Sequence, residues 1–283
     1  MKKTLIASIA LVAASTGFAS AADLPVKAAP MAPVVAPVWG WTGWYIGANV
    51  GAIWTDSEYT LSPSGCFLTN VACGGGVPNN PLRSDVAKLN GNNSVGVTGG
   101  GQFGYNWQMG TFLLGFETDI NGTNLHPNDS VNRPLVAPLV GNFLHTVDEK
   151  LDWFGTVRGR IGVLPVPELL LYATGGLAYG RLSSNTAVSF STTTDVYAGA
   201  FSDTRVGWTA GGGAEWAFSP NWSAKVEYLY IDLGSITYAD ICTTAVCALF
   251  VPPPGYQTDL KTRENIVRFG INYRFGGPVV AKY

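Results

Sequence analysis

The sequence predicts an all-β protein: an eight-stranded antiparallel up-and-down transmembrane β-barrel with short periplasmic turns and long extracellular loops. Hydrophobic residues make up 47% of the chain and charged residues only 13%, whereas ordinary globular chains are about 25% charged. Beyond the N-terminal segment, no run of about 18 apolar residues occurs without a charge or a turn signal, so membrane helices do not explain this composition. Apolar and polar residues instead alternate with period two along several segments, which is the pattern of β-strands.

The first residues have the form of a secretory signal peptide over 1–21. Lys2 and Lys3 form a short basic region, residues 5–14 form an apolar region, and Ala19-Ser20-Ala21 is a small-residue cleavage site. The apolar stretch is too short to span a membrane. We therefore expect a cleavable signal peptide and an exported protein.

A proline-rich segment, residues 22–42, follows the signal peptide. Pro25, Pro30, Pro33 and Pro37 stand among small apolar residues, which favours an extended, polyproline-like chain. We expect a periplasmic linker that lies outside the folded body. The barrel itself is then expected over 43–275, with a C-terminal tail over 276–283.

Eight segments alternate in the way that predicts membrane strands. In the last of them Val267, Phe269 and Ile271 alternate with Arg268 and Gly270. Each segment is near or above the length of about 9–11 residues that a tilted membrane strand needs. The predicted strands are 44–54, 95–108, 111–121, 151–164, 169–183, 204–218, 222–233 and 264–275.

The connections between these strands alternate strictly between short and long. An outer-membrane barrel has this asymmetry, with short periplasmic turns and long extracellular loops. An even number of strands also places both ends of the barrel in the periplasm, as the signal peptide and linker require. A soluble β-sandwich would alternate too, but it need not separate long loops from short ones. The short connections are 108–110, 165–168 and 219–221, and the long ones are 55–94, 122–150, 184–203 and 234–263.

Aromatic residues lie on the apolar face of the predicted strands, and charged residues lie on the opposite face. A charge that faces lipid at mid-depth costs about 2–4 kcal/mol, so we expect these side chains to point inward. Their signs balance, with six acids and six bases, and eight strands leave an interior only just wide enough for side chains. The sequence thus predicts an inward ionic network that fills the lumen by pairing. Its candidates are Glu117, Asp119, Asp152, Arg158, Arg160, Arg205, Glu215, Lys225, Glu227, Glu264, Arg268 and Arg274.

The four cysteines fall in two close pairs, Cys66 with Cys73 and Cys242 with Cys247. Each pair lies in a segment rich in Gly, Pro, Thr and Asn, within the first and last long connections. Two local disulfides in an oxidising compartment are the simplest interpretation. A zinc site is the alternative, although the spacings do not match the common C-x2-C form and no histidine lies nearby.

Two further patterns bear on chemistry. Residues 99–104 read G-G-G-Q-F-G, but a dinucleotide-binding motif needs a strand-to-helix turn, and here the motif lies inside an alternating strand. His126 and His145 share a long connection with Asp129 and Asp148, which keeps a metal, haem or rim-enzyme site open as an alternative. No ligand pattern or nucleophile–base spacing surrounds them.

We expect no catalytic residue, no metal and no cofactor, and the acidic balance does not favour nucleic acid.

Four segments spread over the mature chain carry a family resemblance. They are A-D-L-P-V-K at 22–27, W-T-G-W-Y-I-G at 41–47, V-E-Y-L-Y-I-D-L-G at 226–234 and V-R-F-G-I-N-Y-R-F at 267–275. They resemble the small outer-membrane immunogenic protein family of alpha-proteobacteria, whose members are surface antigens with porin-like eight-stranded barrels. The resemblance implies an abundant surface protein that ties the outer membrane together and is seen by host antibodies. Some members are credited with haem binding or pore formation.

The resemblance also implies a role for the last strand in assembly. Outer-membrane barrels are inserted by a machinery that recognises a terminal strand with glycine and alternating aromatics ending in phenylalanine. Gly270, Tyr273 and Phe275 match this form, although the chain continues to Tyr283. Either Phe275 or Tyr283 is then the terminal aromatic.

Together these features predict a structural protein of the Gram-negative cell outer membrane, which contributes to membrane integrity and to surface interactions and is not an enzyme. The alternative is a small porin-type pore for ions or small solutes, and a rim-located enzyme or haem-binding protein is a further hypothesis. Expected partners are outer-membrane lipid and lipopolysaccharide, the barrel assembly machinery, and a host or environmental surface ligand.

Overall fold

The computed structural model describes residues 40–65, 67, 87–90, 94–135, 140–245 and 253–275. The regular elements within these ranges are all β-strands. No helix among them is long and apolar enough to cross a membrane. The predicted signal peptide, most of the linker and the C-terminal tail lie outside the described residues, so those boundaries stay predictions.

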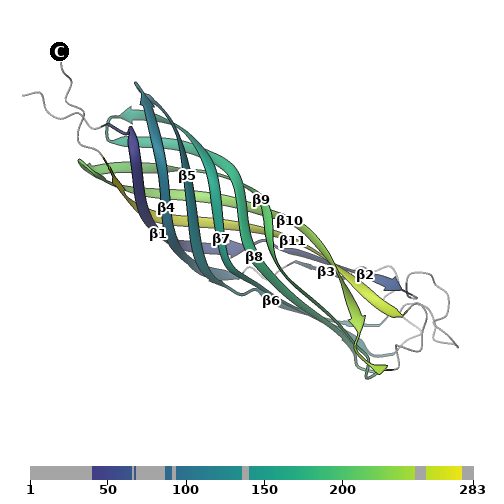
Figure 1. The fold of residues 1–283 in the computed structure, drawn as a ribbon. Helices are drawn as coiled ribbons and strands as arrows, with labels where there is room; N and C mark the ends of the chain where they lie inside the picture. The colour runs from purple at the N-terminus through teal and green to yellow at the C-terminus, as the bar shows by residue number, and fades with distance from the viewer. Residues whose placement is uncertain are drawn as a thin grey trace, which may run out of the picture. The chain divides into compact units, whose positions relative to one another are not determined.

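Eight antiparallel strands form a closed ring (Figure 1). Each strand pairs with the next and the last pairs with the first, in a ladder from Tyr45↔Arg274 to Thr55↔Glu264. In lipid every backbone polar group must find its partner within the protein, so a membrane sheet has to close. The predicted eight-stranded barrel is confirmed. Around the ring the strands are β1 (Gly43–Thr55), β4 (Val95–Met109), β5 (Phe112–Leu125), β7 (Asn142–Val166), β8 (Leu169–Phe190), β9 (Val196–Ser219), β10 (Trp222–Cys242) and β11 (Pro254–Arg274).

Tight turns join β4 to β5, β7 to β8 and β9 to β10 at one end of the ring. In the first of them Gly110 has a φ of 64°, a left-handed conformation that residues with a side chain rarely adopt. These turns lie where the sequence predicts its short connections. The opposite end of the ring is where the long connections begin.

A band of exposed apolar side chains surrounds the ring near these turns. Val50 and Phe269, for example, are 57% and 62% exposed on neighbouring strands. Exposed tryptophans such as Trp44, Trp107 and Trp208 stand towards the two borders of this band, as aromatic girdles do in outer-membrane barrels. The segments bounded by these side chains are the membrane-spanning ones. They are 44–50, 95–109, 112–120, 157–166, 169–177, 206–218, 222–228 and 267–275.

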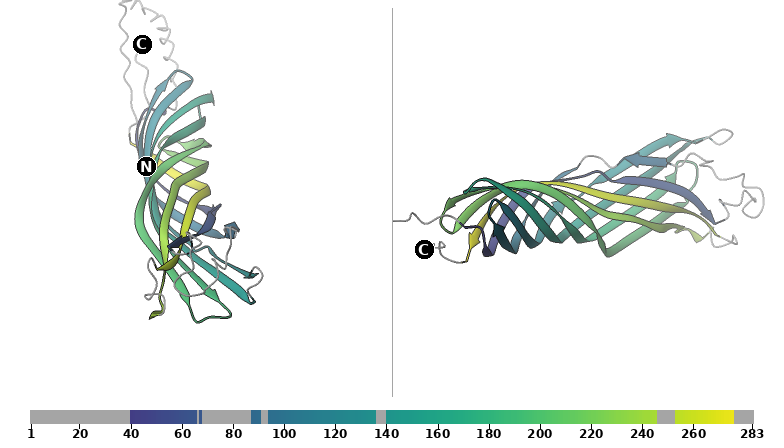
Figure 2. Two further views of the ribbon diagram at one scale, coloured as in Figure 1. Left: turned by 90° about the vertical axis from the view of Figure 1, so that its right-hand side faces the viewer. Right: turned by 90° about the horizontal axis from the view of Figure 1, so that it is seen from above.

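Strands β7 to β11 continue far beyond this band, and Figure 2 shows the elongated wall of strands at this end. Strands β7 to β11 are 25, 22, 24, 21 and 21 residues long, about twice the length that a tilted membrane strand needs. Three short strands lengthen the wall further: β2 (Glu58–Gly65) pairs with β11, β3 (Ala87–Asn90) with β2, and β6 (Asn128–Pro134) with β7. We call this region the distal extension. It comprises β2, β3, β6 and residues 142–151, 182–190, 196–204, 235–242 and 254–264.

Much of what the sequence predicts as long loops is therefore strand. The outward residues of the distal extension are mostly small and polar, such as Asp148 on β7 and Asn185 on β8, and they alternate with buried residues such as Val147. Ser, Thr and Asn are typical of turns and loops. Their abundance on the outer face hides the strand pattern, so the predicted strands end too early.

The distal extension consists of two sheets. The ladder between β9 and β10 stops at Asp232↔Trp208 and resumes only at Ile241↔Ala198, and no ladder joins β3 to β6 among the described residues. One sheet is thus β6-β7-β8-β9 and the other is β10-β11-β2-β3. Apolar side chains of both sheets pack together between them, as in a β-sandwich: Val147 and Leu182 meet Tyr59, Ile236 and Leu260.

The linker does not lie wholly outside the folded body as expected, because Trp41 near its end is buried in the barrel. Trp41 is 2% exposed and packs against Leu113 and Leu164 at the turn end of the barrel. Its backbone N–H donates to Oε1 of Gln108 over 2.8 Å, and its indole Nε1 donates to the Pro167 carbonyl over 2.9 Å. A buried indole needs both an apolar site and a partner for its N–H, and the inside of this end supplies both.

Candidate functional site

Charged and apolar layers alternate inside the barrel. The inward residues of β11 show this order, because Arg268, Ile266, Glu264, Leu260 and Tyr256 follow one another from the membrane band into the distal extension. All five are buried, and the three apolar ones belong to three separate clusters. The layers therefore stack along the axis of the barrel.

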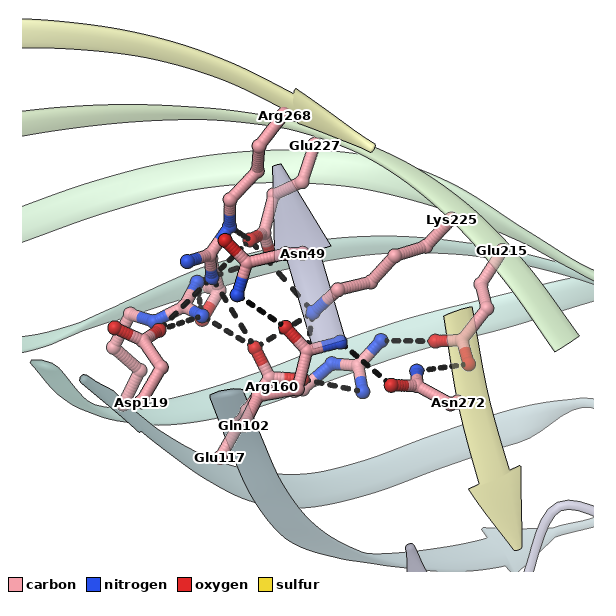
Figure 3. A network of polar contacts seen from close by, with 12 residues as sticks. Asn49, Gln102, Glu117, Asp119, Arg160, Glu215, Lys225, Glu227, Arg268 and Asn272 are labelled. Carbon is pink, nitrogen blue, oxygen red and sulfur yellow. Dashed lines mark hydrogen bonds and ion pairs between the residues drawn. The ribbon is translucent and has the colours of Figure 1, made fainter. Parts of the chain in front are cut away.

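The charged layer within the membrane band centres on Glu117 of β5 (Figure 3). Nζ of Lys225 lies 2.8 Å from both carboxylate oxygens of Glu117, and Nη2 of Arg158 donates to its Oε1. Arg160 and Arg268 each have a guanidinium nitrogen 3.5 Å from the same carboxylate. One carboxylate thus faces four bases.

Two further carboxylates bridge two of these bases. Oδ2 of Asp119 lies 3.0 Å from Nη2 of Arg158 and 2.9 Å from Nη2 of Arg268. Glu227 lies 3.0 Å from Nη1 of Arg158 and 2.6 Å from Nη2 of Arg268. These contacts join β5 and β7 to β10 and β11 across the interior.

Glu215 of β9 compensates the remaining arginine. Its Oε2 lies 2.7 Å from Nη2 of Arg160, while its Oε1 accepts from Ser223 over 2.6 Å and from Nδ2 of Asn272 over 2.7 Å. The Arg160 guanidinium also stands 4.0 Å from the centroid of the Tyr172 ring, a cation–π arrangement.

We call this cluster the ionic network. It contains eight of the predicted twelve residues, all of them buried. A buried charge without a partner is strongly destabilising, whereas a paired and hydrogen-bonded one can be tolerated. The network satisfies this condition because its four acids face four bases: Glu117, Asp119, Glu215 and Glu227 face Arg158, Arg160, Lys225 and Arg268.

Uncharged side chains complete the ionic network, and a search for charges alone misses them. The Tyr45 hydroxyl donates to Oε2 of Glu117 over 2.8 Å. Asn49 donates to Gln102 over 2.9 Å, and Gln102 donates to Asn272 over 2.6 Å. These residues lie on the same strand faces as the charges, so strand alternation was the signal that could have found them.

Asp152 does not join the ionic network and points outward. Its side chain is 31% exposed, and its Oδ1 lies 2.6 Å from Nζ of Lys150. The register between β7 and β8 shifts between Leu151 and Trp153. This bulge reverses the alternation of the strand at Asp152, which strict period-two counting cannot anticipate.

Three other predicted members also lie apart from the ionic network. Arg205 is partly exposed and donates to the backbone carbonyl of Ser235, in the stretch where the β9–β10 ladder is interrupted. Arg274 is buried at the turn end and donates to the Pro220 carbonyl over 2.9 Å. Glu264 is buried in the distal extension.

A second acidic layer lies in the distal extension, beyond an apolar cluster. Glu149 of β7 accepts hydrogen bonds from the hydroxyls of Tyr59, Thr262 and Ser57. Burial raises the pKa of the Glu149 carboxyl above its ordinary value. Only hydroxyls contact this carboxyl among the described residues, so nothing there compensates an ionised form.

Glu264 of β11 belongs to the same layer and is 1% exposed. Burial, followed by the charge of Glu149, raises the pKa of its carboxyl well above the usual range. Thr55 donates to this carboxyl, and Oγ1 of Thr55 also lies 2.7 Å from Oγ of Ser57, which contacts Glu149. We call Glu149, Glu264 and their hydroxyl partners the carboxyl pair.

Asp240 and His145 are buried further out. Asp240 accepts from the hydroxyls of Thr186 and Thr258, and burial raises the pKa of its carboxyl. Burial lowers the pKa of His145 to about 4, and neither ring nitrogen has a hydrogen-bond partner within the described ranges. His126 is exposed, so the structure does not bring the two histidines together.

The remaining predicted sites stay predictions. Cys242 ends β10, whereas Cys66, Cys73 and Cys247 lie outside the described residues. In the last strand Gly270 is buried beside Lys225, and the rings of Tyr273 and Phe275 pack on the outside with centroids 5.4 Å apart. Tyr283 also lies outside the described residues. Within the described ranges, no group of three or more His, Cys, Asp or Glu side chains is placed to hold a metal ion.

Comparison with known proteins agrees with this architecture. Residues 9–275 match the family model described as "Outer membrane protein beta-barrel domain". The chain is similar to the 31 kDa outer-membrane immunogenic protein of Brucella melitensis, with 36% identity over 97% of this chain and 100% of the relative. It is also similar to a 22 kDa outer membrane protein of Rhizobium leguminosarum, with 33% identity over 62% of this chain and 66% of the relative.

Among solved structures, 82% of this chain matches 97% of the outer membrane protease OmpT of Escherichia coli, with 8% identity and a TM-score of 0.44. So low an identity and score say nothing about activity. The Brucella relative confirms the resemblance to outer-membrane immunogenic proteins that the sequence motifs predict. Because the family model covers nearly the whole chain and the relative matches over its full length, this protein belongs to the outer membrane protein β-barrel family.

Proposed function

We propose that this protein is a closed structural barrel of the outer membrane, which presents the distal extension at the cell surface and is neither a pore nor an enzyme. The observation that carries the proposal is the balanced ionic network. Its four acids and four bases pair with one another across the interior, so no net charge is left to attract a permeating ion. An interior of eight strands has little room beyond such side chains.

Apolar layers on both sides of the ionic network support the same proposal. Ile53, Phe154, Leu229 and Ile266 are fully buried in one cluster on its distal side. Trp41 and its apolar neighbours fill the turn end on the other side. An ion on its way through would have to leave water and cross both layers, which is costly in a medium of low dielectric constant.

The orientation of the barrel supports a role at the surface. Outer-membrane barrels keep their short turns in the periplasm, so the distal extension faces outward. The Brucella relative carries the name of an immunogenic protein, which fits a surface-exposed region. The polar outer wall of the distal extension is suited to hydrogen bonds with the sugars of lipopolysaccharide, which we propose as a partner in membrane integrity.

Planar-bilayer recording of the purified, refolded protein tests the closed barrel. We expect no ion conductance above that of the protein-free bilayer, because the interior layers block the lumen. The same preparation is also inserted into lipid vesicles. Heat-modifiable electrophoretic mobility of the protein recovered from them verifies that the barrel is folded and membrane-inserted. Reproducible single-channel steps from such protein would establish the pore alternative instead.

A further inference from the structure

Two carboxyl groups share one buried layer of the distal extension without a base beside them. Glu149 and Glu264 are each 1% exposed, and the charge of Glu149 acts on the carboxyl of Glu264. No ion pair joins either carboxyl to a Lys, Arg or His side chain among the described residues. An ionised pair at this position would therefore be uncompensated, which proteins avoid by binding protons or a cation.

One oxygen of this layer has no hydrogen-bond partner in the part of the chain that the structure describes. Oε2 of Glu264 is fully buried and accepts no hydrogen bond from any described residue. Most buried polar atoms in native proteins have at least one partner, and an exception indicates a missing water, ion or functional constraint. Asp240 offers a contrast on the same face of the neighbouring strand, because Thr186 and Thr258 supply one hydroxyl to each of its carboxyl oxygens.

Among the described residues, the atoms that could bind a cation around the pair are all oxygens. Besides the two carboxyls, the layer contains the hydroxyls of Thr55, Ser57 and Thr262. Ca²⁺ and similar hard cations take carboxylate, hydroxyl, carbonyl and water oxygens and no sulfur or nitrogen. Two carboxylates also carry the charge that one divalent cation neutralises.

We propose that Glu149 and Glu264 are the acidic ligands of a buried site for one hard divalent cation, Ca²⁺ in the first place, in the distal extension. Binding converts an acidic layer into a neutral one and connects β7 to β11, which belong to the two different sheets of this region. The cation thereby holds the two sheets together. It enters while the strands associate, because the finished site is closed to solvent.

Calcium content after refolding tests the proposal. The chain is refolded in detergent without lipopolysaccharide, in millimolar CaCl₂, then desalted and analysed for bound calcium by atomic emission. We expect about one Ca²⁺ per wild-type chain after desalting, because the site is closed to solvent and retains the ion. A parallel refolding in MgCl₂ measures selectivity for the larger ion.

Three variants locate the site. Glu264→Gln should lower bound calcium at least fivefold and abolish the rise in melting temperature that calcium gives the wild type. Asp240→Asn removes a buried carboxyl of the same region outside the pair and should keep both effects. If Glu264→Gln fails to fold, Thr262→Val replaces it, because loss of one hydroxyl ligand should weaken calcium binding and leave the carboxyls in place.

Two outcomes overturn the proposal. Wild-type protein that retains no calcium and shows no calcium-dependent melting shift has a carboxyl pair that holds protons instead. Equal calcium in wild type, Glu264→Gln and Thr262→Val places the bound ion on another part of the chain.

Discussion

The two acidic layers of this barrel are equally buried but are compensated in different ways. In the membrane band, Glu117 and three other acids meet four bases inside the ionic network. In the distal extension, Glu149 and Glu264 meet only hydroxyls among the described residues. The difference follows the surroundings. Within the bilayer the protein has to bring its own countercharges, whereas above it protons and dissolved cations are available during folding.

The comparison also separates two kinds of stability. The ionic network is neutral as a unit. Its stability should therefore depend strongly on each of its members and only weakly on the pH and ion content of the solution. The carboxyl pair is neutral only with protons or a cation bound, because burial raises the pKa of both groups. Stability of the distal extension should therefore depend on pH and on ions, and that of the membrane band should not.

The largest effect is expected from Glu117→Gln. The change removes the carboxylate that faces four bases, and breaking a buried ion pair from one side costs about 3–5 kcal/mol. Urea unfolding of the refolded barrel, followed by tryptophan fluorescence, should show a much lower midpoint. Asp148→Asn, an exposed acid of β7, is the control and should leave the midpoint unchanged. A wild-type midpoint for Glu117→Gln would mean that the charges are not interdependent.

A smaller loss is expected when an acid and a base are removed together. In Glu117→Gln combined with Lys225→Met, the ionic network keeps equal numbers of acids and bases. Replacing a buried pair by neutral groups is often close to neutral in stability. The double variant should therefore recover at least half of the midpoint lost by Glu117→Gln. A double variant with a midpoint no higher than that of Glu117→Gln would argue that side-chain shape, and not charge balance, governs the stability of this layer.

His145 should make the distal extension sensitive to acid. Its folded pKa of about 4 lies below its ordinary value of 6.5, so the unfolded chain binds the proton more readily. The contribution of His145 to stability then falls as pH drops from about 6.5 towards 4, by roughly 2 kcal/mol at pH 5. The difference between wild type and His145→Phe in the protection of the β7 amides of the distal extension, taken at pH 5 and at pH 7.5 relative to intrinsic exchange, measures this loss.

In His145→Phe the acid-dependent loss should disappear. In calcium-free buffer, what remains is the opposite trend of the carboxyls of Glu149, Glu264 and Asp240, whose pKa is raised by burial, so that the folded state holds protons which the unfolded state releases. Protection should then decrease only as pH rises. An unchanged acid-induced loss in this variant would assign the sensitivity to another group.

The smallest effect is expected from Asp152→Asn. This acid pairs with Lys150 on the outer surface, and exposed ion pairs are worth about 0–1 kcal/mol. The urea midpoint should shift by less than about a third of the change seen for Glu117→Gln, and high salt should remove even that. A loss comparable with that of Glu117→Gln would return Asp152 to the set of structurally essential charges.

The ring of strands and the core of the ionic network could be predicted because both depend on strict alternation. Arg158, Arg160 and Glu117 fall on one face in a lipid-facing wall, so simple counting places them inside. Counting fails where the backbone departs from regularity. The bulge beside Leu151 turns Asp152 outward, and the β9–β10 gap draws Arg205 to a backbone carbonyl.

The distal extension could not be predicted for a different reason. Its outer face carries residues typical of loops, and its inner face carries residues typical of a core. The composition of these segments therefore indicates loops, while their alternation indicates strands. Tyr59, Thr262 and Glu149 come from three strands that only the register brings together. The burial of Trp41 could not be predicted either, because nothing in the proline-rich segment 22–42 indicates that its last residues are buried.

The ladder between β1 and β11 has a consequence for how the barrel forms. Tyr45 pairs with Arg274, near the opposite ends of the described chain, and contacts between residues so distant in sequence are slow to form because of the entropy of closing the loop. The first strand must therefore keep an unpaired edge until the last strand arrives. During that interval the unpaired edge of β1 is open to pairing with a foreign strand, which is the first step of aggregation.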